Sequence, residues 1–344
     1  AEAEGNLYRI AQGQYNSLLT DRGQRQVAAL EQRFADIHVD AVYSSDLYRT
    51  CATAAAIYKP KGLELHRRTD LREICVGVWE QRTWGDIARA DPEQMANFSL
   101  HPERWQVEGG EAPAAVLRRV RAAVEDIARK NEGRTVAVFS HGYAIRLLLA
   151  SLQGYSLEQL AATPVGDNTA VSKLEERDGK LEVVFRDDNS HLRTPEYLAG
   201  ETKGKRANGL EPGLRFLPLC PAEQAAFLDR CTRETGVIVQ PDGQVLVGYL
   251  GEEPVGLLQM GAGQGQIALA YIQPEYRGRG FGVQLLGQAV RLTRETGGKT
   301  VLVRPGASAA FWSRYGFRPG TQADTLEKDI GFDPAYLALP PAEV

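Results

Sequence analysis

Three segments in the first half of the chain carry side chains suited to phosphoryl chemistry. They are SSDLYR with Arg49, LREICVGVWE with Glu73 and VFSHG with His141. The planar guanidinium of Arg49 can donate two parallel hydrogen bonds to a phosphoryl group. Glu73 could protonate a leaving oxygen if burial raised its pKa, and His141 stands at the end of an apolar run. Each residue alone is more often structural, but the three together predict a phosphoryl-transfer site.

A second set of residues, within YIQPEYRGRGFGVQLLGQAV (271–290), predicts an anion-binding turn. Gly278, Gly280 and Gly282 lack Cβ atoms, so backbone N–H groups can approach a ligand closely. The amphipathic helix that follows adds the positive end of its dipole, which suits a pyrophosphate. The glycine spacing differs from GxGxxG and no repeated βαβ unit follows, which disfavours a dinucleotide site. The alternative is a solvated turn between a strand and a helix.

The first set of residues is positioned by helices and short apolar strands that alternate through residue 190. Thr20 can serve as the N-cap of a helix over 20–35, and residues 113–130 and 144–152 are also helical in pattern. TVAVFSHG (135–142) predicts a buried strand that ends in a polar turn. The alternation predicts an α/β sandwich with a mainly parallel sheet, in which ligands bind at the carboxyl ends of the strands.

The second half of the chain has a different pattern. Residues 193–211 lose the apolar periodicity and gather Gly, Lys and Pro, which predicts a linker. Several strands follow in succession, with a strong helix at 283–294 and a shorter one at about 307–315, an α+β pattern. We therefore predict domains at 1–200 and 212–344, with 201–211 between them.

Composition limits the classes of function. A chain of 344 residues with 43% hydrophobic and 24% charged residues fits two soluble domains. The net charge is −4 and neither half is basic, which argues against nucleic acid as a partner. The apolar stretches are too short for a transmembrane helix. The four cysteines occur singly and no Asp/His cluster suggests a metal, so we expect a cytoplasmic protein without a metal or a disulfide framework.

About residues 1–195 resemble the histidine phosphatase superfamily, which has the phosphoglycerate mutase-like fold. SSDLYRTCATA matches its second-Arg motif, LREICVGVWEQRTW its acid-containing loop and SHG its second histidine. AEAEGNLYRIAQGQYNSLLTDRG looks like the stretch after its Arg-His-Gly motif, and NTAVSKLE and NSHL fit its closing segments. The resemblance implies a three-layer α/β/α domain.

The same resemblance implies covalent catalysis through a phosphohistidine, with Arg49, Glu73 and His141 as catalytic residues. Glu73 would protonate the leaving alkoxide and then activate water. Glu2 is a secondary candidate, with exposure near the chain terminus as the alternative. The residues expected to bind phosphate are Asn6, Gln12, Gly13, Arg49 and His141.

One departure from the superfamily concerns the nucleophile. The family's nucleophilic His and its neighbouring Arg should lie immediately before Ala1, at the end of a first strand. We expect the natural protein to have roughly ten more residues upstream, enough for that strand and the Arg-His pair. The alternative is a domain that evolved without its nucleophile.

About residues 212–335 resemble the GNAT acyltransferase superfamily, in which Arg277-x-x-Gly280-x-Gly282 corresponds to the acyl-coenzyme A pyrophosphate loop. The resemblance implies acetyl-CoA as the acyl donor. Many members carry a Tyr that protonates the departing thiolate. Trp312 occupies the aligned position and Tyr315, one turn later, is the substitute. No general base can be named. The residues expected to bind the cofactor are Ile272, Arg277, Gly278, Arg279, Gly280, Phe281 and Gly282.

The leading hypothesis is a bifunctional enzyme that hydrolyses a small phosphorylated metabolite and acetylates a small-molecule or peptide amine. A mutase is disfavoured because the short segment 80–112 leaves little room for an elaborate lid. One alternative is an active acetyltransferase with a noncatalytic phospho-ligand-binding module. Another keeps the acyltransferase fold as a cofactor sensor, given Trp312. The four residues Asn6, Arg49, Glu73 and His141 should converge on one cleft, and the two domains should have separate cores.

Overall fold

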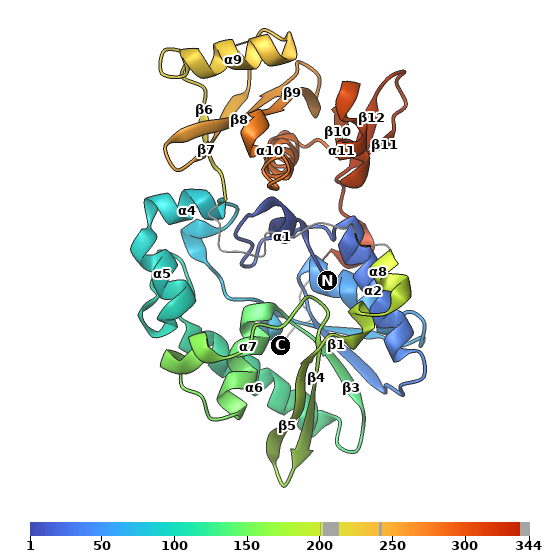
Figure 1. Ribbon diagram of the computed structural model, residues 1–344. Coiled ribbons are helices and arrows are strands. Elements are labelled where there is room, and N and C mark those ends of the chain that lie inside the picture. Colours follow the sequence, from blue (N-terminus) through green and yellow to red (C-terminus); the bar gives the residue numbers. More distant parts are fainter. Residues whose placement is uncertain (200, 202–212, 241–242, 338–344) are drawn as a thin grey trace.

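The computed structural model describes residues 1–199, 201, 213–240 and 243–337. Figure 1 shows a lower α/β part and an upper part built on a twisted sheet. Nearly all of the predicted linker, 201–211, lies outside the described residues, so the domain boundaries stay a prediction.

The first part has a three-stranded parallel sheet in the order β2-β1-β3 and a separate antiparallel hairpin, β4-β5. The strands are β1 (Ala41–Ser45), β2 (Leu65–Arg68), β3 (Val136–Phe139), β4 (Val171–Arg177) and β5 (Lys180–Asp188). The helices are α1 (Glu4–Tyr8), α2 (Asp21–Phe34), α3 (Tyr48–Tyr58), α4 (Trp84–Ala90), α5 (Pro92–Leu100), α6 (Pro113–Lys130), α7 (Gly142–Leu152) and α8 (Pro195–Ala199).

The second part has one seven-stranded sheet in the order β11-β12-β10-β9-β8-β7-β6. Its strands are β6 (Arg215–Pro218), β7 (Val245–Leu250), β8 (Glu253–Met260), β9 (Gln266–Ile272), β10 (Thr300–Val303), β11 (Arg318–Pro319) and β12 (Leu326–Asp329). Its helices are α9 (Ala225–Thr235), α10 (Gly282–Glu295) and α11 (Ala309–Arg314). Across the chain, 3-10 helices occupy Thr69–Leu71, Gly77–Trp79, Pro102–Arg104, Leu157–Ala162, Ser190–Leu192, Pro274–Tyr276, Gly306–Ser308 and Pro334–Tyr336.

Local sequence accounts for the helices that frame the sites. Thr20 caps α2 as predicted, because its hydroxyl accepts a hydrogen bond from the N–H of Gly23 at 3.0 Å. The helix then packs through Val27, Leu30 and Phe34 in a cluster with Val42 of β1. The predicted helices at 113–130 and 283–294 are confirmed as α6 and α10.

The first sheet has an open edge. β3 pairs with β1 on one side, and on its other side it pairs with no strand among the described residues. The prediction of a strand within 135–142 is confirmed, but the prediction that this strand is buried is wrong. Every residue of β3 is partly or fully exposed, and Val138 is 36% exposed.

A cavity of about 2430 Å³ is lined by β3 and β4, with Phe34 and Ile37 in its wall, and extends as far as the glycine-rich segment Gly278–Phe281. Apolar side chains and charged ones such as Arg33 and Lys173 line this cavity together with the unpaired edge of β3.

Each part has hydrophobic clusters of its own, so the prediction of separate cores holds for most of the molecule, but one cluster of the second part also takes in residues of α1. Tyr8 of α1 is 3% exposed and belongs to the same cluster as Leu286, Val290 and Trp312. A Cβ on Gly287 of α10 would lie 2.5 Å from the Cβ of Tyr8, so only glycine permits this packing. Figure 1 shows α1 lying against α10, at the junction of the two parts.

A buried ion pair joins the same two helices. Arg294, near the end of α10, donates to both oxygens of Glu4 on α1, at 2.8 and 3.2 Å. The two side chains are only 16% and 6% exposed. Arg294 also donates to the carbonyl of Ile330 and lies 4.9 Å from the ring centroid of Phe332. The first turn of the chain is thus held by charge as well as by apolar packing.

We expect Arg294→Ala to lower the free energy of unfolding by about 3–5 kcal/mol, because it leaves the Glu4 carboxylate buried without its cation. Arg291→Ala is the matched control. Arg291 lies on the same helix, is half-buried, and donates to Glu295 at i,i+4 and to Gln288 at 3.1 Å, so its loss should change stability by about 1 kcal/mol or less. Chemical denaturation of the full chain measures both. Equal losses would show that the ion pair does not hold the two parts together.

Candidate functional site

Arg49 lies in the first turn of α3, where β1 has just ended, and is 8% exposed. Its Nη1 donates to the carbonyl of Tyr15 at 2.9 Å and its Nη2 to the carbonyl of Gly13 at 2.8 Å. Burial lowers the pKa of Arg49 to about 10, so the group remains protonated at neutral pH. These two bonds fix the guanidinium at the cavity wall and leave three of its five N–H groups for a ligand.

His141 follows β3 and is the N-cap residue of α7. Its Nε2 lies 2.8 Å from the hydroxyl oxygen of Ser45, at the end of β1, and both residues are buried. Burial, followed by the charge of Arg49, holds the pKa of His141 well below its usual value, so the ring is neutral. Sequence reasoning missed Ser45, although its place at a parallel strand's carboxyl end was a signal.

Glu73 lies beside the start of α7. Its carboxylate accepts hydrogen bonds from the backbone N–H groups of Ile74, Tyr143 and Ala144, at 3.0–3.2 Å. Burial raises the pKa of Glu73, and the nearby charge of Arg49 and the backbone donors oppose that rise. A fixed carboxyl group with a raised pKa can hold a proton for transfer.

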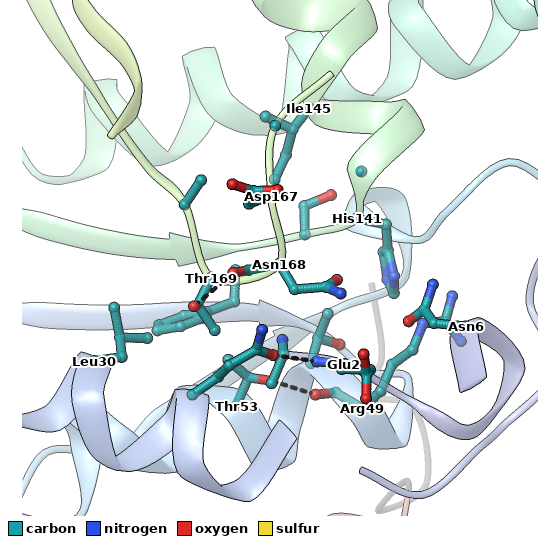
Figure 2. Close-up of a pocket in the computed structure, with 18 of the residues that line it drawn as sticks. Glu2, Asn6, Leu30, Arg49, Thr53, His141, Ile145, Asp167, Asn168 and Thr169 are labelled. Atoms are coloured by element: carbon teal, nitrogen blue, oxygen red, sulfur yellow. Dashed lines mark hydrogen bonds between the residues drawn. The ribbon is translucent and has the colours of Figure 1, made fainter. Parts of the chain in front are cut away.

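The segment after α1 completes this wall of the cavity. Figure 2 shows Asn6 beside Arg49 and His141, and Asn6 Oδ1 accepts a hydrogen bond from the N–H of Ala3. Gly13 has φ +49°, and a Cβ there would lie 2.3 Å from Glu80 Oε1, so the turn requires glycine. Gln12 accepts a hydrogen bond from the hydroxyl of Ser17 and also lines the cavity. All four residues expected to converge, Asn6, Arg49, Glu73 and His141, line this one cavity.

Two further residues, Glu2 and Asn168, line the cavity. Glu2 lines the cavity, is 4% exposed and accepts a hydrogen bond from the Thr20 hydroxyl at 2.8 Å, so the alternative of an exposed Glu2 is wrong. Asn168 was missed, and Figure 2 shows it reaching toward His141 from the opposite wall. The only signal for Asn168 was its place at the start of the closing segment NTAVSKLE.

The glycine-rich turn stands between β9 and α10. Gly278 and Gly280 have φ of +75° and +82°, and nothing lies within 4 Å of a Cβ built on either. The N–H groups of Gly280 and Phe281 donate to no backbone carbonyl of the described residues. A Cβ on Gly282 would instead lie 3.0 Å from the Phe311 ring, so Gly282 allows α11 to pack closely. The turn offers backbone donors to an anion at the start of a helix.

The arginines of the turn have different partners. Arg277 Nε donates to the carbonyl of Ile272, the last residue of β9, at 2.8 Å, and its guanidinium pairs with Glu234 at 3.3 Å. The guanidinium of Arg279 lies over the rings of Tyr276 and Phe281, 5.4 and 5.2 Å from their centroids. Arg277 therefore braces the turn against the end of β9.

Two aromatic residues of α11 and its end differ in their surroundings: Trp312 is buried and Tyr315 lines the cavity. Trp312 is 5% exposed and packs edge-on against Phe311 and Phe317. Tyr315 ends the helix, with its ring centroid 4.9 Å from that of Phe311, and it lines the cavity. Of these two candidates, only Tyr315 stands where a ligand can reach it.

Beside this turn, β9 and β10 separate. Their parallel pairing covers only Leu302 with Gln266 and Val303 with Ile267, although β9 continues to Ile272. Past this point the edge of β9 that faced β10 has no strand partner among the described residues. An extended ligand with amide groups can pair with such an edge.

Within the described ranges there is no group of three or more His, Cys, Asp or Glu residues placed to hold a metal ion. No described helix is both long and apolar enough to span a membrane.

Comparison with known proteins identifies the first part. The family model of the histidine phosphatase superfamily (branch 1) matches residues 1–189. The chain belongs to this superfamily. Residues 241–319 match the acetyltransferase (GNAT) domain, so the fusion of the two families and the fold class predicted from the motifs are confirmed.

Relatives of the histidine phosphatase part include enzymes named for different reactions. Phosphoserine phosphatase 1 of Hydrogenobacter thermophilus is 31% identical over 159 residues, 46% of this chain and 75% of the relative. The probable phosphoglycerate mutase GpmB of Yersinia enterocolitica is 32% identical over 153 residues, 44% of this chain and 71% of the relative. The solved structure of Bacillus stearothermophilus YhfR is 29% identical with a TM-score of 0.55, covering 56% of this chain and 95% of YhfR.

Proposed function

We propose that the histidine phosphatase domain hydrolyses a small phosphomonoester through a phosphohistidine, and that the GNAT domain transfers an acetyl group from acetyl-CoA to an amine. The convergence of Arg49, Glu73 and His141 on one cavity supports the first activity. A fixed cation and a neutral imidazole can bind and stabilise a phosphoryl group, and a carboxyl group with a raised pKa can protonate its leaving oxygen. The relative named phosphoserine phosphatase 1 favours hydrolysis.

The nucleophile is assigned to a strand upstream of Ala1. The open edge of β3 and the part of the cavity between β3 and β4 leave room for one more strand. A strand parallel to β3 would end at the same edge of the sheet as β3, where His141 and Arg49 lie. Ala1 itself lines the cavity, with its nitrogen 3.0 Å from the hydroxyl of Thr53. A histidine at the end of that strand would stand opposite the phosphate-binding groups.

The proposed reaction has two displacements at phosphorus. In the first, an imidazole nitrogen of the upstream histidine forms a bond to phosphorus while the ester P–O bond breaks, and Glu73 gives its proton to the leaving oxygen. In the second, the Glu73 carboxylate takes a proton from water as that water displaces the imidazole and releases phosphate. Arg49, His141 and Asn6 would hold the phosphoryl oxygens throughout.

A specific observation favours the alternative, a noncatalytic phospho-ligand-binding module. The chain has five histidines, and only His141 lines the cavity. In that alternative the cavity would bind a phosphorylated ligand and the GNAT domain would carry the chemistry. The phosphatase and the noncatalytic module differ in whether a second imidazole, besides that of His141, reaches the phosphate.

For the GNAT domain, the backbone donors of the glycine-rich turn and the open edge of β9 support acetyl-CoA binding. The turn would bind the pyrophosphate, and the amide groups of the pantetheine chain would pair with β9. Tyr315 would protonate the departing thiolate. A well-positioned water molecule would take the proton of the acceptor amine, or the amine would bind already in its neutral form, so no side chain is assigned as the general base.

Hydrolysis by a chain that includes the upstream strand tests the role of Glu73. Glu73→Gln should lower the rate for an alkyl phosphate by about 100-fold or more, because an alkoxide leaves only with a proton. The loss should be much smaller for p-nitrophenyl phosphate, since p-nitrophenolate leaves without one. The rate for the alkyl phosphate should fall as pH rises through the raised pKa of Glu73, and the variant should lose this fall.

Glu125→Gln, on the exposed face of α6, is the control and should change neither substrate's rate. Equal losses of rate for both phosphates in Glu73→Gln would remove Glu73 from the role of acid.

A further inference from the structure

Residues 70–75 form the loop that carries Glu73, here called the acid loop, and a side chain of α6 holds its backbone. Arg119 of α6 donates hydrogen bonds to three carbonyls of this loop. Its Nη1 reaches those of Asp70 and Arg72, at 3.1 and 2.6 Å, and its Nη2 reaches that of Glu73, at 2.9 Å. One guanidinium therefore fixes the backbone of the segment that carries the proposed acid.

Glu111 fixes this guanidinium in turn. Its carboxylate accepts hydrogen bonds from Nε and Nη2 of Arg119, both at 2.7 Å, and the two side chains are largely buried. The backbone N–H of Glu111 also donates to the carbonyl of Cys75 at 2.8 Å. A planar guanidinium that pairs with both oxygens of a carboxylate has a defined orientation, so Arg119 and Glu111 hold the acid loop as a unit.

The donors of Arg119 are all used within the protein. A guanidinium has five N–H groups, and Arg119 makes five hydrogen bonds, three to carbonyls and two to carboxylate oxygens. Arg119 also does not line the cavity of the phosphoryl site, whereas Arg49 does. Arg119 is therefore placed to hold the loop and not to bind a substrate.

Glu73 is held through both its backbone and its side chain. Its carbonyl accepts hydrogen bonds from Arg119 and from Nε2 of Gln14, the latter at 3.1 Å. Its carboxylate accepts from the N–H groups of Tyr143 and Ala144, at 3.2 and 3.1 Å. A shift of the acid loop would move the carboxyl group away from these donors. Because proton transfer needs hydrogen-bond distance, a displacement of about 1 Å can cost about 100-fold in rate.

We propose that Arg119 is a positioning residue for Glu73, which through the backbone of the acid loop places the carboxyl group for proton transfer at the phosphoryl site. This inference rests on the role of Glu73 proposed above. The alternative is a role in stability alone, because the ion pair of Arg119 with Glu111 also holds α6 to the loop.

Hydrolysis by a chain that includes the upstream strand separates the two roles. Arg119→Gln should lower kcat for an alkyl phosphate about tenfold or more and leave KM nearly unchanged, since Arg119 does not line the cavity. The loss should be much smaller for p-nitrophenyl phosphate, which needs no acid. Arg118→Gln, at an exposed neighbouring position on α6, is the control and should match the wild type with both substrates.

Arg119→Lys separates geometry from charge. Lysine keeps the positive charge that faces Glu111 and His141, but its three N–H groups cannot replace the five of the guanidinium. This variant should therefore recover thermal stability more fully than it recovers the rate for the alkyl phosphate. Full recovery of both by lysine would leave Arg119 with a role in charge and stability and overturn the inference.

The carboxyl group of Glu73 can also be titrated by NMR in the 344-residue chain itself. Burial raises the pKa of Glu73, so release of the acid loop in Arg119→Gln should bring that pKa down toward its ordinary value. An unchanged pKa in this variant, or equal losses of rate for both phosphates, would overturn the inference alone. If Glu73→Gln itself slows both phosphates equally, the acid role in the proposed function fails instead.

Discussion

A chain extended upstream of Ala1 by a strand that ends in Arg-His should hydrolyse p-nitrophenyl phosphate, and the 344-residue chain should not. The chain presents Arg49, Glu73 and His141 to the cavity, but no imidazole other than His141 lines it. Loss of a catalytic nucleophile typically costs about four orders of magnitude in rate or more. Release of p-nitrophenolate by the two purified chains measures the difference.

The extended chain also provides the matched control. The same strand with its histidine changed to glutamine would fill the space beside β3 without supplying a nucleophile, so it separates folding from catalysis. This control should be as inactive as the 344-residue chain. In the active extended chain, His141→Ala should remove most of the rate. Robust hydrolysis by the 344-residue chain, unaffected by His141→Ala, would contradict the phosphohistidine mechanism.

The positions of the phosphoryl-site residues could be predicted because each follows a strong local pattern. An apolar run followed by Ser140-His141-Gly142 marks a strand, a turn and a helix start, and β3 and α7 have these bounds. Parallel strands end at one edge of a sheet, so residues after β1 and β3 had to meet. The hydroxyl partner of His141, Ser45, needed the register between these strands, which the sequence does not contain.

The packing of α1 into the core of the second part could not be predicted, because its contacts join distant segments without any local pattern. Residues 1–6 are mostly acidic or small, which is typical of an exposed terminus. Glu4 is nevertheless buried, because its partner Arg294 lies on the other domain. Arg294 in turn looks like an ordinary basic residue in the last turn of a helix. Burial of a charge depends on its partner, and the partner is known only from the fold.

The burial of β3 was wrongly predicted for a related reason. Its apolar sequence is typical of a strand covered on both faces and both edges. The described residues supply a neighbour on one edge only, so Val138 stays partly exposed. The apolar sequence of β3 is thus typical of a strand with a neighbour on each edge, and the described strands supply a neighbour on one edge only. This agrees with the proposed upstream strand.

Gly280→Val is expected to abolish acetyl-CoA binding by the full chain. Gly280 has φ +82°, which a β-branched residue adopts only with strain, and no atom lies within 4 Å of the Cβ position. The branched side chain would stand beside the unpaired N–H groups of Gly280 and Phe281, so it would exclude the pyrophosphate from the turn. We expect at least about a 100-fold loss of affinity, since several charge-assisted hydrogen bonds are lost together.

Other variants separate the parts of the turn. Arg277→Ala should weaken binding less, because Arg277 braces β9 and pairs with Glu234. Trp312→Phe should leave the affinity nearly unchanged, because Trp312 packs in the core between Phe311 and Phe317. The titration must use the full chain, because Tyr8 fills part of the hydrophobic core around α10. A fragment that starts at residue 212 would lack Tyr8 and would leave that core exposed to solvent.

Gly297→Val is the control for backbone strain. Gly297 follows α10 at the end away from the turn, has φ +76° and also has nothing within 4 Å of its Cβ position. Valine should therefore cost a similar amount of folding free energy at either glycine, and thermal unfolding of the two variants checks this. If Gly280→Val loses acetyl-CoA binding while Gly297→Val keeps it, the loss comes from the ligand's own space. Equal affinity of the wild type and Gly280→Val would rule out the turn as the pyrophosphate site.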